Sequence, residues 1–175
     1  MSKIAKMMQQ AAAGSAGGAG LDIDDVFSTF LYEGNGVARS ITNGIDLSGE
    51  GGLVWIKNRE DSQQHWLFDT ERGSPYGLRS ATDNAQLSRP YFGSFLSNGW
   101  SYAGTDLNSG AINKSGEDYV SWTFRKAPKF FDVVTYTGTS SAQAISHNLG
   151  SVPGMIIVKC TNDTGNWRVY HRGLD

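Results

Sequence analysis

One apolar and aromatic stretch occurs twice in the chain, roughly a hundred residues apart. Residues 51–73 read GGLVWIKNREDSQQHWLFDTERG, and residues 153–173 read PGMIIVKCTNDTGNWRVYHRG. Lys57 aligns with Lys159 at an offset of 102 residues, so an apolar run precedes each lysine and a polar turn follows it. A segment that recurs with its parts in the same order indicates one structural unit used in tandem.

The similarity extends on both sides of these lysines. Trp66 aligns with Trp167 at an offset of 101, so the second copy has lost one residue from the intervening turn. Upstream, the alignment pairs Tyr32 with Tyr136, Gly34 with Gly138 and Ile41 with Ile145. We therefore predict a first module over residues 21–129 and the first half of a second, homologous module over residues 130–175.

This second module has no counterpart of residues 74–129. A β unit without half of its strands exposes apolar faces and unpaired edges to water, which is unfavourable. Three arrangements would remedy this: the chain continues beyond Asp175, the half module folds onto the first module, or strands of another protomer complete it. We expect the first.

The residue pattern from Phe27 onward is typical of a β protein. The chain has 22 glycines and many short turn signals. Between them lie short aromatic or β-branched runs, namely GLVWIK, HWLFD, YVSWTF, FDVVTYTG, MIIVK and WRVYH. GLVWIK and MIIVK are apolar at consecutive positions, which predicts central strands covered on both faces. The predicted fold is mainly β: a β-sandwich module of the jelly-roll or lectin-like type, tandemly repeated, with a short N-terminal helix.

Residues 1–20 differ from the rest of the chain. An apolar stripe at helical spacing predicts a helix over about residues 2–13 that docks on another surface, with Ile4, Met7, Met8 and Ala11 as the docking residues. The glycine-rich segment up to Gly20 reads as a flexible tether. The folded part then begins with clustered aspartates, of which Asp22 or Asp24 can cap a short turn of helix.

Composition excludes several classes of protein. The 15 basic and 17 acidic residues leave a net charge of -2, so we expect neither a nucleic-acid partner nor an anionic membrane. No apolar segment approaches the roughly 20 residues of a membrane-spanning helix, and the N-terminus lacks the apolar core of a signal peptide. Cys160 is the only cysteine, and its position in an apolar run predicts a buried structural thiol.

The sequence contains no pattern that predicts a catalytic, cofactor or metal site. His65, His147 and His171 lie too far apart for a helical metal motif, and each is explained by a strand end or a turn. Asp69 and Glu71 could flank a polysaccharide as a carboxylate pair, but the second copy has no acidic residue there. We therefore predict no enzyme activity and no cofactor.

The tryptophans are the strongest candidates for a binding role. Their flat apolar faces could stack on sugar rings, although aromatic residues also dominate β cores. Trp66 and Trp167 recur at the aligned position, which favours a core role. Trp100 follows the turn signal SNG and is the candidate glycan contact.

The repeated stretches resemble a known group of proteins. The residues that carry the resemblance are GGLVWIKNR with HWLFDTERG, YVSWTF, FDVVTYTGTSSAQAISHNLGSVPGMIIVK and NWRVYHRGLD, after a short MSKIAKMMQQAAAG start. They look like the tandem modules of tail-fibre and related virion proteins of tailed bacteriophages, especially those of aquatic bacteria. The resemblance covers nearly all of residues 27–175 and includes no catalytic motif.

What this resemblance implies is a non-enzymatic virion protein, commonly a homotrimer when it is a fibre, with its N-terminus toward the particle. The expected function is the N-terminal particle-attachment region of a tail fibre, assembled in the host cytoplasm and bound to a tail, baseplate or adaptor protein. Two alternatives stay open: a head or neck fibre, and an adhesin module that binds a glycan of the host surface.

Overall fold

The computed structural model describes residues 20–104 and 111–174, which are mainly β with antiparallel sheets. The described helix α2 (Ile23–Val26) is a single turn. Asp22 is its N-cap, and the Asp22 carboxylate accepts a hydrogen bond from the backbone N–H of Asp24 at 3.1 Å. This confirms that the aspartate cluster caps a helical turn. The first strand then begins at Phe27.

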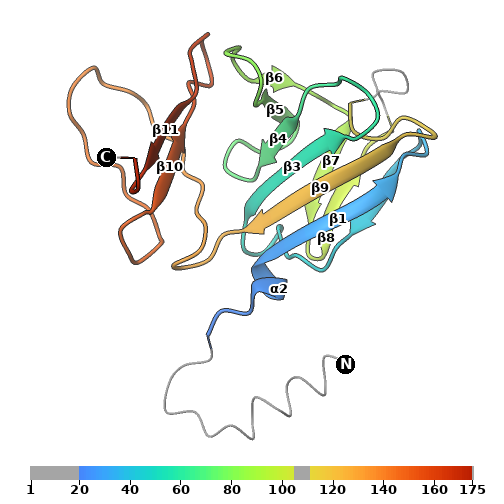
Figure 1. Cartoon of the computed structure of the whole chain (residues 1–175), viewed down its shortest axis with the longest axis horizontal. Coiled ribbons are helices and arrows are strands. Elements are labelled where there is room, and N and C mark those ends of the chain that lie inside the picture. The colour runs from blue at the N-terminus through green and yellow to red at the C-terminus, as the bar shows by residue number, and fades with distance from the viewer. Residues whose placement is uncertain (1–19, 105–110, 175) are drawn as a thin grey trace, which may run out of the picture.

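Six strands form the larger sheet, in the order β1-β9-β3-β4-β5-β6, and every neighbouring pair is antiparallel. Figure 1 shows β1, β9 and β3 side by side. The strands are β1 (Phe27–Glu33), β3 (Gly52–Asn58), β4 (Trp66–Asp69), β5 (Tyr76–Arg79), β6 (Leu87–Ser88) and β9 (Asp118–Arg125). The prediction that GLVWIK is a central strand is confirmed, because β3 lies between β4 and β9.

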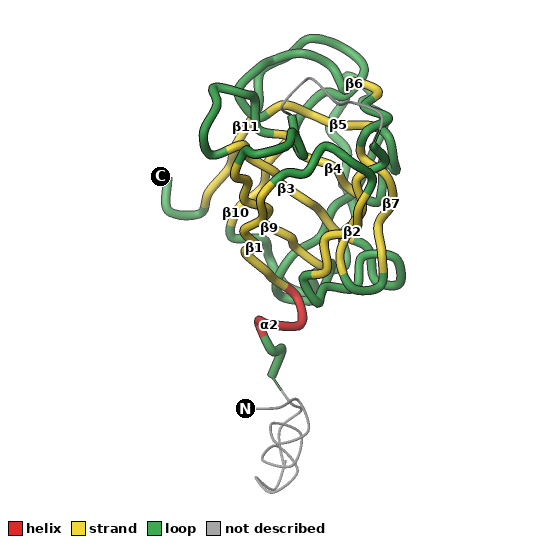
Figure 2. Tube along the Cα trace, turned by 90° about the vertical axis from the view of Figure 1, so that its right-hand side faces the viewer, coloured by secondary structure: helices red, strands yellow, loops and turns green. Residues whose placement is uncertain are grey.

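Three strands form a second antiparallel sheet in the order β2-β8-β7. These are β2 (Arg39–Thr42), β7 (Phe92–Leu96) and β8 (Gly99–Tyr102). Figures 1 and 2 show this sheet lying against one face of the larger one. Two antiparallel layers with a shared core are consistent with the predicted β-sandwich.

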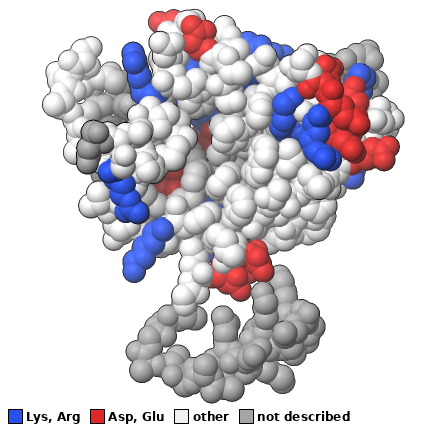
Figure 3. All heavy atoms as spheres, viewed as in Figure 1, with Lys and Arg blue, Asp and Glu red and all other residues white. Residues whose placement is uncertain are grey.

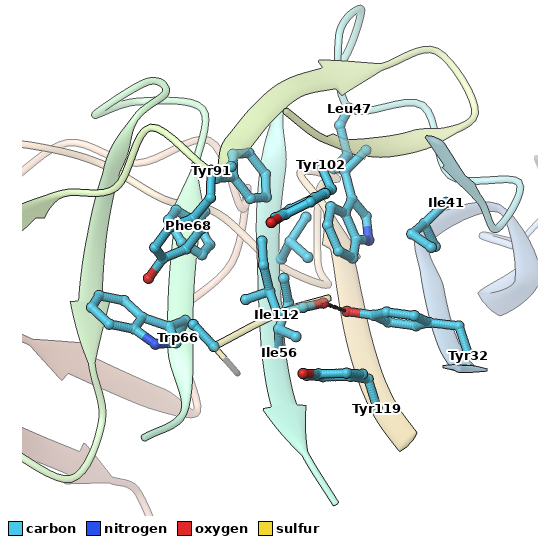
Figure 4. Packing of buried hydrophobic residues seen from close by; sticks show 14 of the residues in the cluster. Tyr32, Ile41, Leu47, Ile56, Trp66, Phe68, Tyr91, Tyr102, Ile112 and Tyr119 are labelled. Carbon is cyan, nitrogen blue, oxygen red and sulfur yellow. Dashed lines mark hydrogen bonds between the residues drawn. The ribbon is translucent and has the colours of Figure 1, made fainter. Parts of the chain in front are cut away.

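The core lies between the two layers and is rich in aromatic rings (Figure 4). Phe92 of the smaller sheet stacks on Phe68 of the larger sheet, with ring centroids 4.2 Å apart. Phe92 also stacks on Trp100, at 5.6 Å. The hydroxyl of Tyr32 donates to the backbone carbonyl of Ile112 at 2.5 Å, so its one buried polar atom is satisfied.

The last two strands, β10 (Met155–Val158) and β11 (Arg168–His171), form a separate antiparallel hairpin. The prediction that MIIVK is a covered central strand is wrong, because β10 pairs only with β11 among the described strands and its side chains are largely exposed. The predicted strand FDVVTYTG is also absent: residues 132–138 have no assigned strand. A strand needs a neighbour for its backbone groups, and no described strand pairs with these residues.

The hairpin touches the sandwich through the loop between its strands. The Trp167 indole N–H donates to the carbonyls of Arg79 and Thr82, at 3.3 and 3.0 Å. Backbone bonds from Gly165 to Asp83 and from Gln86 to Thr161 continue this contact. Trp167 therefore reaches another part of the chain rather than a core of its own.

Trp66 and Trp167 occupy different places relative to their hairpins. Ile56 pairs with Trp66 within the β3–β4 pair, whereas Val158 pairs with Arg168. Trp167 thus lies one residue before β11, and a shift of one residue moves a side chain to the opposite face. The residue lost from the turn accounts for this shift.

No helix within residues 20–104 and 111–174 combines the length and apolar character needed to cross a membrane.

Candidate functional site

The larger sheet has apolar side chains on both faces. The inner residues of β3 are buried, whereas Leu53 and Trp55 point outward and are half-buried. On the neighbouring strand, Trp122 lies directly opposite Trp55, and Leu31 of β1 is opposite Val120. Solvent-facing positions of an antiparallel sheet are usually polar, so an apolar outer face indicates a contact surface.

Three rings form the centre of this outer face, and we call them the outer aromatic cluster: Trp55, His65 and Trp122. Trp55 meets Trp122 edge to face, with centroids 5.9 Å apart. His65 lies parallel to Trp122, with centroids 6.5 Å apart and planes 7° apart. The Trp55 indole N–H donates to Nδ1 of His65 at 2.9 Å, which fixes the His65 ring and places its proton on Nε2.

Burial and a neighbouring charge favour the neutral form of His65. Burial is the main cause that lowers the pKa of His65 below its ordinary value of 6.5, and the charge of Lys57 lowers it further. Lys57 is held close by, because its ammonium group donates to the carbonyls of Asp61 and Gln63 at 2.8 and 3.0 Å. A neutral imidazole suits an apolar contact better than a charged one.

Charged groups surround the outer face and are sparse on it (Figure 3). The view is that of Figure 1: uncharged atoms cover most of the area that β1, β9 and β3 form, and charged side chains gather at the upper-right ends of these strands. Leu31 is 60% exposed there. The outer face can therefore bind a flat apolar surface or a ring that stacks on indole.

The comparisons with known proteins give a family. A family model described as a domain of unknown function, DUF7483, matches residues 22–175. The chain belongs to this DUF7483 family. No curated protein and no solved structure matches the chain. The DUF7483 match covers both segments that the sequence predicts as separate modules.

Of the predicted binding residues of this DUF7483 chain, Trp100 is the one within the described ranges. Ile4, Met7, Met8 and Ala11, the predicted docking stripe, lie outside the described residues. Trp100 is 1% exposed and belongs to the core, so the prediction of a glycan contact at Trp100 is wrong. The residue before it, Gly99, begins β8 and lies so close to β2 that an added Cβ atom would be 2.0 Å from the Ile41 carbonyl oxygen.

Asp69 and Glu71 do not form a carboxylate pair around a substrate. Asp69 is buried and bound to Arg72, whose Nη2 lies 2.5 Å from its carboxylate. Glu71 bonds instead to Lys126 at 2.6 Å. Each carboxylate is therefore paired with a cation of the fold itself.

Cys160 is exposed, so the prediction of a buried thiol is wrong. The run that contains it lies in the uncovered hairpin rather than in a core. His147 and His171 accept hydrogen bonds from the backbone N–H groups of Leu149 and Gly173. Within the described ranges, no group of three His, Cys, Asp or Glu residues has metal-binding geometry.

Trp55 and Trp122 are among the tryptophans that the sequence offers as binding candidates, whereas His65 is explained there by a strand end. Alternation along GLVWIK and YVSWTF does place Trp55 and Trp122 on one side of each strand. Their meeting depends on the pairing of β3 with β9, which are separated by about 60 residues in the chain. Only the folded sheet brings these residues and His65 together.

Proposed function

We propose that this DUF7483 chain is a non-enzymatic structural protein of a bacteriophage virion, in the N-terminal particle-attachment region of a tail fibre. The observation that carries the proposal is the β10–β11 hairpin, whose apolar side chains are largely exposed. Such a hairpin is marginal alone in water and is stabilised by further polypeptide. Proteins of large assemblies meet that requirement, and the resemblance of the repeated stretches to virion modules points to this kind of assembly.

The proposal includes the tandem organisation: a jelly-roll or lectin-like unit over residues 21–129, followed by half of a homologous unit over residues 130–175. In support, the aligned segments that begin at Leu53 and Met155 both form the first strand of an antiparallel pair. Three copies around a fibre axis would bring three outer faces and three hairpins together. Such multivalency raises avidity without new kinds of contact.

Labelling of virions tests the proposed position. Antibodies raised against residues 20–174 are applied to purified particles of a phage that encodes the chain, and the label is located by electron microscopy. Label at the tail end supports the tail-fibre proposal. Label on the capsid or neck favours a head or neck fibre instead, and particles without label would overturn a virion role.

A host-glycan adhesin is the second candidate, and the outer aromatic cluster favours it. Indole faces stack on the apolar faces of sugar rings, and Trp122 lies half-buried on an uncharged surface. A glycan array with the wild-type chain and the Trp122→Ala variant tests this function. We expect Trp122→Ala to abolish binding, and Thr29→Ala, on the exposed position opposite Trp122, to retain it. Absence of binding by the wild-type chain rules this candidate out.

A further inference from the structure

The strands that form in residues 130–174 follow a simple rule. By the sequence alignment, residues 131–137 correspond to β1, residues 143–146 to β2, and β10 to part of β3. In the sandwich, β1 pairs with β9 and β2 pairs with β8. The counterparts of β8 and β9 are absent from residues 130–174, and the counterparts of β1 and β2 are not strands. The strands that the structure describes in this range are β10 and β11, which pair with each other.

Burial follows the same rule at aligned positions. The side chains that form the core of the first unit are exposed in the second, although their chemical character is kept. Ile41 is 1% exposed and Ile145 37%; Tyr32 is 7% exposed and Tyr136 50%; Val54 is 0% exposed and Ile156 43%. A face that keeps its apolar side chains but has no layer over them is suited to pack against strands from elsewhere.

The edge of β10 identifies which strand is missing. β3 has β4 on one edge and β9 on the other. β10 has β11 on the edge that corresponds to β4, and no described strand on the other edge. An edge strand with free backbone groups and apolar side chains is a template for one more strand.

We propose that the open edge of β10 binds an antiparallel strand with the sequence pattern of β9, contributed by a further unit of the same kind. The inference rests on the tandem organisation under the proposed function. A folded second copy of this chain does not supply the strand, because its own β9 is paired on both edges, with β1 and with β3. The occupant is therefore a polypeptide segment outside residues 130–174 in which the YVSWTF pattern is unpaired.

The pairing of β3 with β9 also gives the register. Val54 lies opposite Thr123, and Ile56 lies opposite Ser121. Transferred to β10, this register places Ile156 opposite the residue of the incoming strand that corresponds to Thr123. Directly opposite residues in antiparallel strands have Cα atoms close enough for a disulfide, whereas residues two positions off register do not.

A disulfide-trapping experiment tests both the binding and the register. The probe is a synthetic peptide with the sequence of residues 115–127, SGEDYVSWTFRKA, carrying Thr123→Cys. The partner is the full chain with Ile156→Cys and with Cys160→Ser, which removes the exposed native thiol. Under mild oxidation we expect a cross-linked product at about ten times the yield obtained with the Ser121→Cys peptide, which is two residues off register.

Two measurements make the outcome decisive. The chain with Val54→Cys and Cys160→Ser shows whether the peptide replaces β9 inside the sandwich, and we expect no cross-link there. Adding the unmodified peptide should slow hydrogen exchange at the backbone amides of residues 155–158. This result would support strand addition without any engineered cysteine. Equal yields in and out of register, cross-linking to the Val54→Cys chain alone, or unchanged exchange would each overturn the proposal. If the cross-link does not form, labelling of virions still tests the proposed function. If virions carry no label, the cross-link still tests strand addition at β10. The two failures are therefore distinguishable.

Discussion

Asp69 and Arg72 form an ion pair that is largely removed from solvent, with side chains 8% and 6% exposed. The pair is tied into β4, because Arg72 also donates to the Leu67 carbonyl at 3.1 Å. Removing one partner leaves a buried charge without compensation, and Asp69→Ala should therefore cost about 3–5 kcal/mol of the free energy of unfolding. Urea denaturation measures this change.

The neighbouring pair between Glu71 and Lys126 is the matched control. Its side chains are 35% and 21% exposed, so the charges are better solvated. We expect Glu71→Gln to cost less than about 1 kcal/mol. A similar loss for both variants would show that burial does not separate the two pairs.

The lowered pKa of His65, of which burial is the main cause, predicts a pH effect. The pKa of His65 in the folded state is lowered below its ordinary value of 6.5. At pH values between these two pKa values, the unfolded chain therefore binds more protons than the folded chain. Stability should therefore fall as the pH is lowered from about 6.5 to the folded-state pKa, and His65 should contribute no further change below it. NMR titration of the His65 ring measures the pKa directly.

Trp55→Phe tests the cause of this behaviour. The indole N–H bonds only to an unprotonated Nδ1, so its removal should raise the pKa of His65 toward 6.5. Trp122→Phe keeps this bond and is the control. A pKa that moves equally in both variants would assign the effect to burial alone.

At the scale of elements, aligned positions in the two similar stretches of sequence should respond differently to the same change. Ile41 of β2 is in the core, and Ile41→Ala should destabilise the chain by about 2–5 kcal/mol because it leaves a cavity. Ile145→Ala, at the exposed counterpart, should cost less than about 1 kcal/mol. Thermal or urea unfolding of the two variants compares them, and equal losses would mean that residues 143–146 are covered in solution.

The hairpin should be held to the sandwich mainly by its loop. Trp167→Ala removes the two bonds to the Arg79 and Thr82 carbonyls. We expect faster hydrogen exchange in residues 155–171 and 79–86, with β1, β3 and β9 unchanged. Exchange that rises throughout the chain would instead make Trp167 part of one cooperative unit.

At the scale of the whole molecule, the predicted docking stripe and the folded part should be separable. A variant without residues 1–20 should unfold at the same temperature as the full chain, because the core that the structure describes is built from residues after Gly20. In a phage that encodes it, the same deletion should produce particles that lack the protein. Particles that retain the shortened protein would contradict the prediction that it docks through Ile4, Met7, Met8 and Ala11.

The sequence alone predicted the class of fold and several elements. Strict local chemistry explains this success: Asp22 caps whichever helical turn follows it, and the β-branched and aromatic content of GLVWIK, HWLFD and YVSWTF favours extended backbone in any context. These features depend on neighbours in the chain, which the sequence contains.

The tertiary structure alone decided which apolar residues are covered. Ile41 and Ile145 have the same side chain at aligned positions, but β8 lies beside Ile41 and no described strand lies beside Ile145. Trp100 follows a turn signal and is nevertheless buried, whereas Cys160 in an apolar run is exposed. Burial is a property of non-local pairing, since a strand is covered only when its partner, many residues away, is present to bond with it.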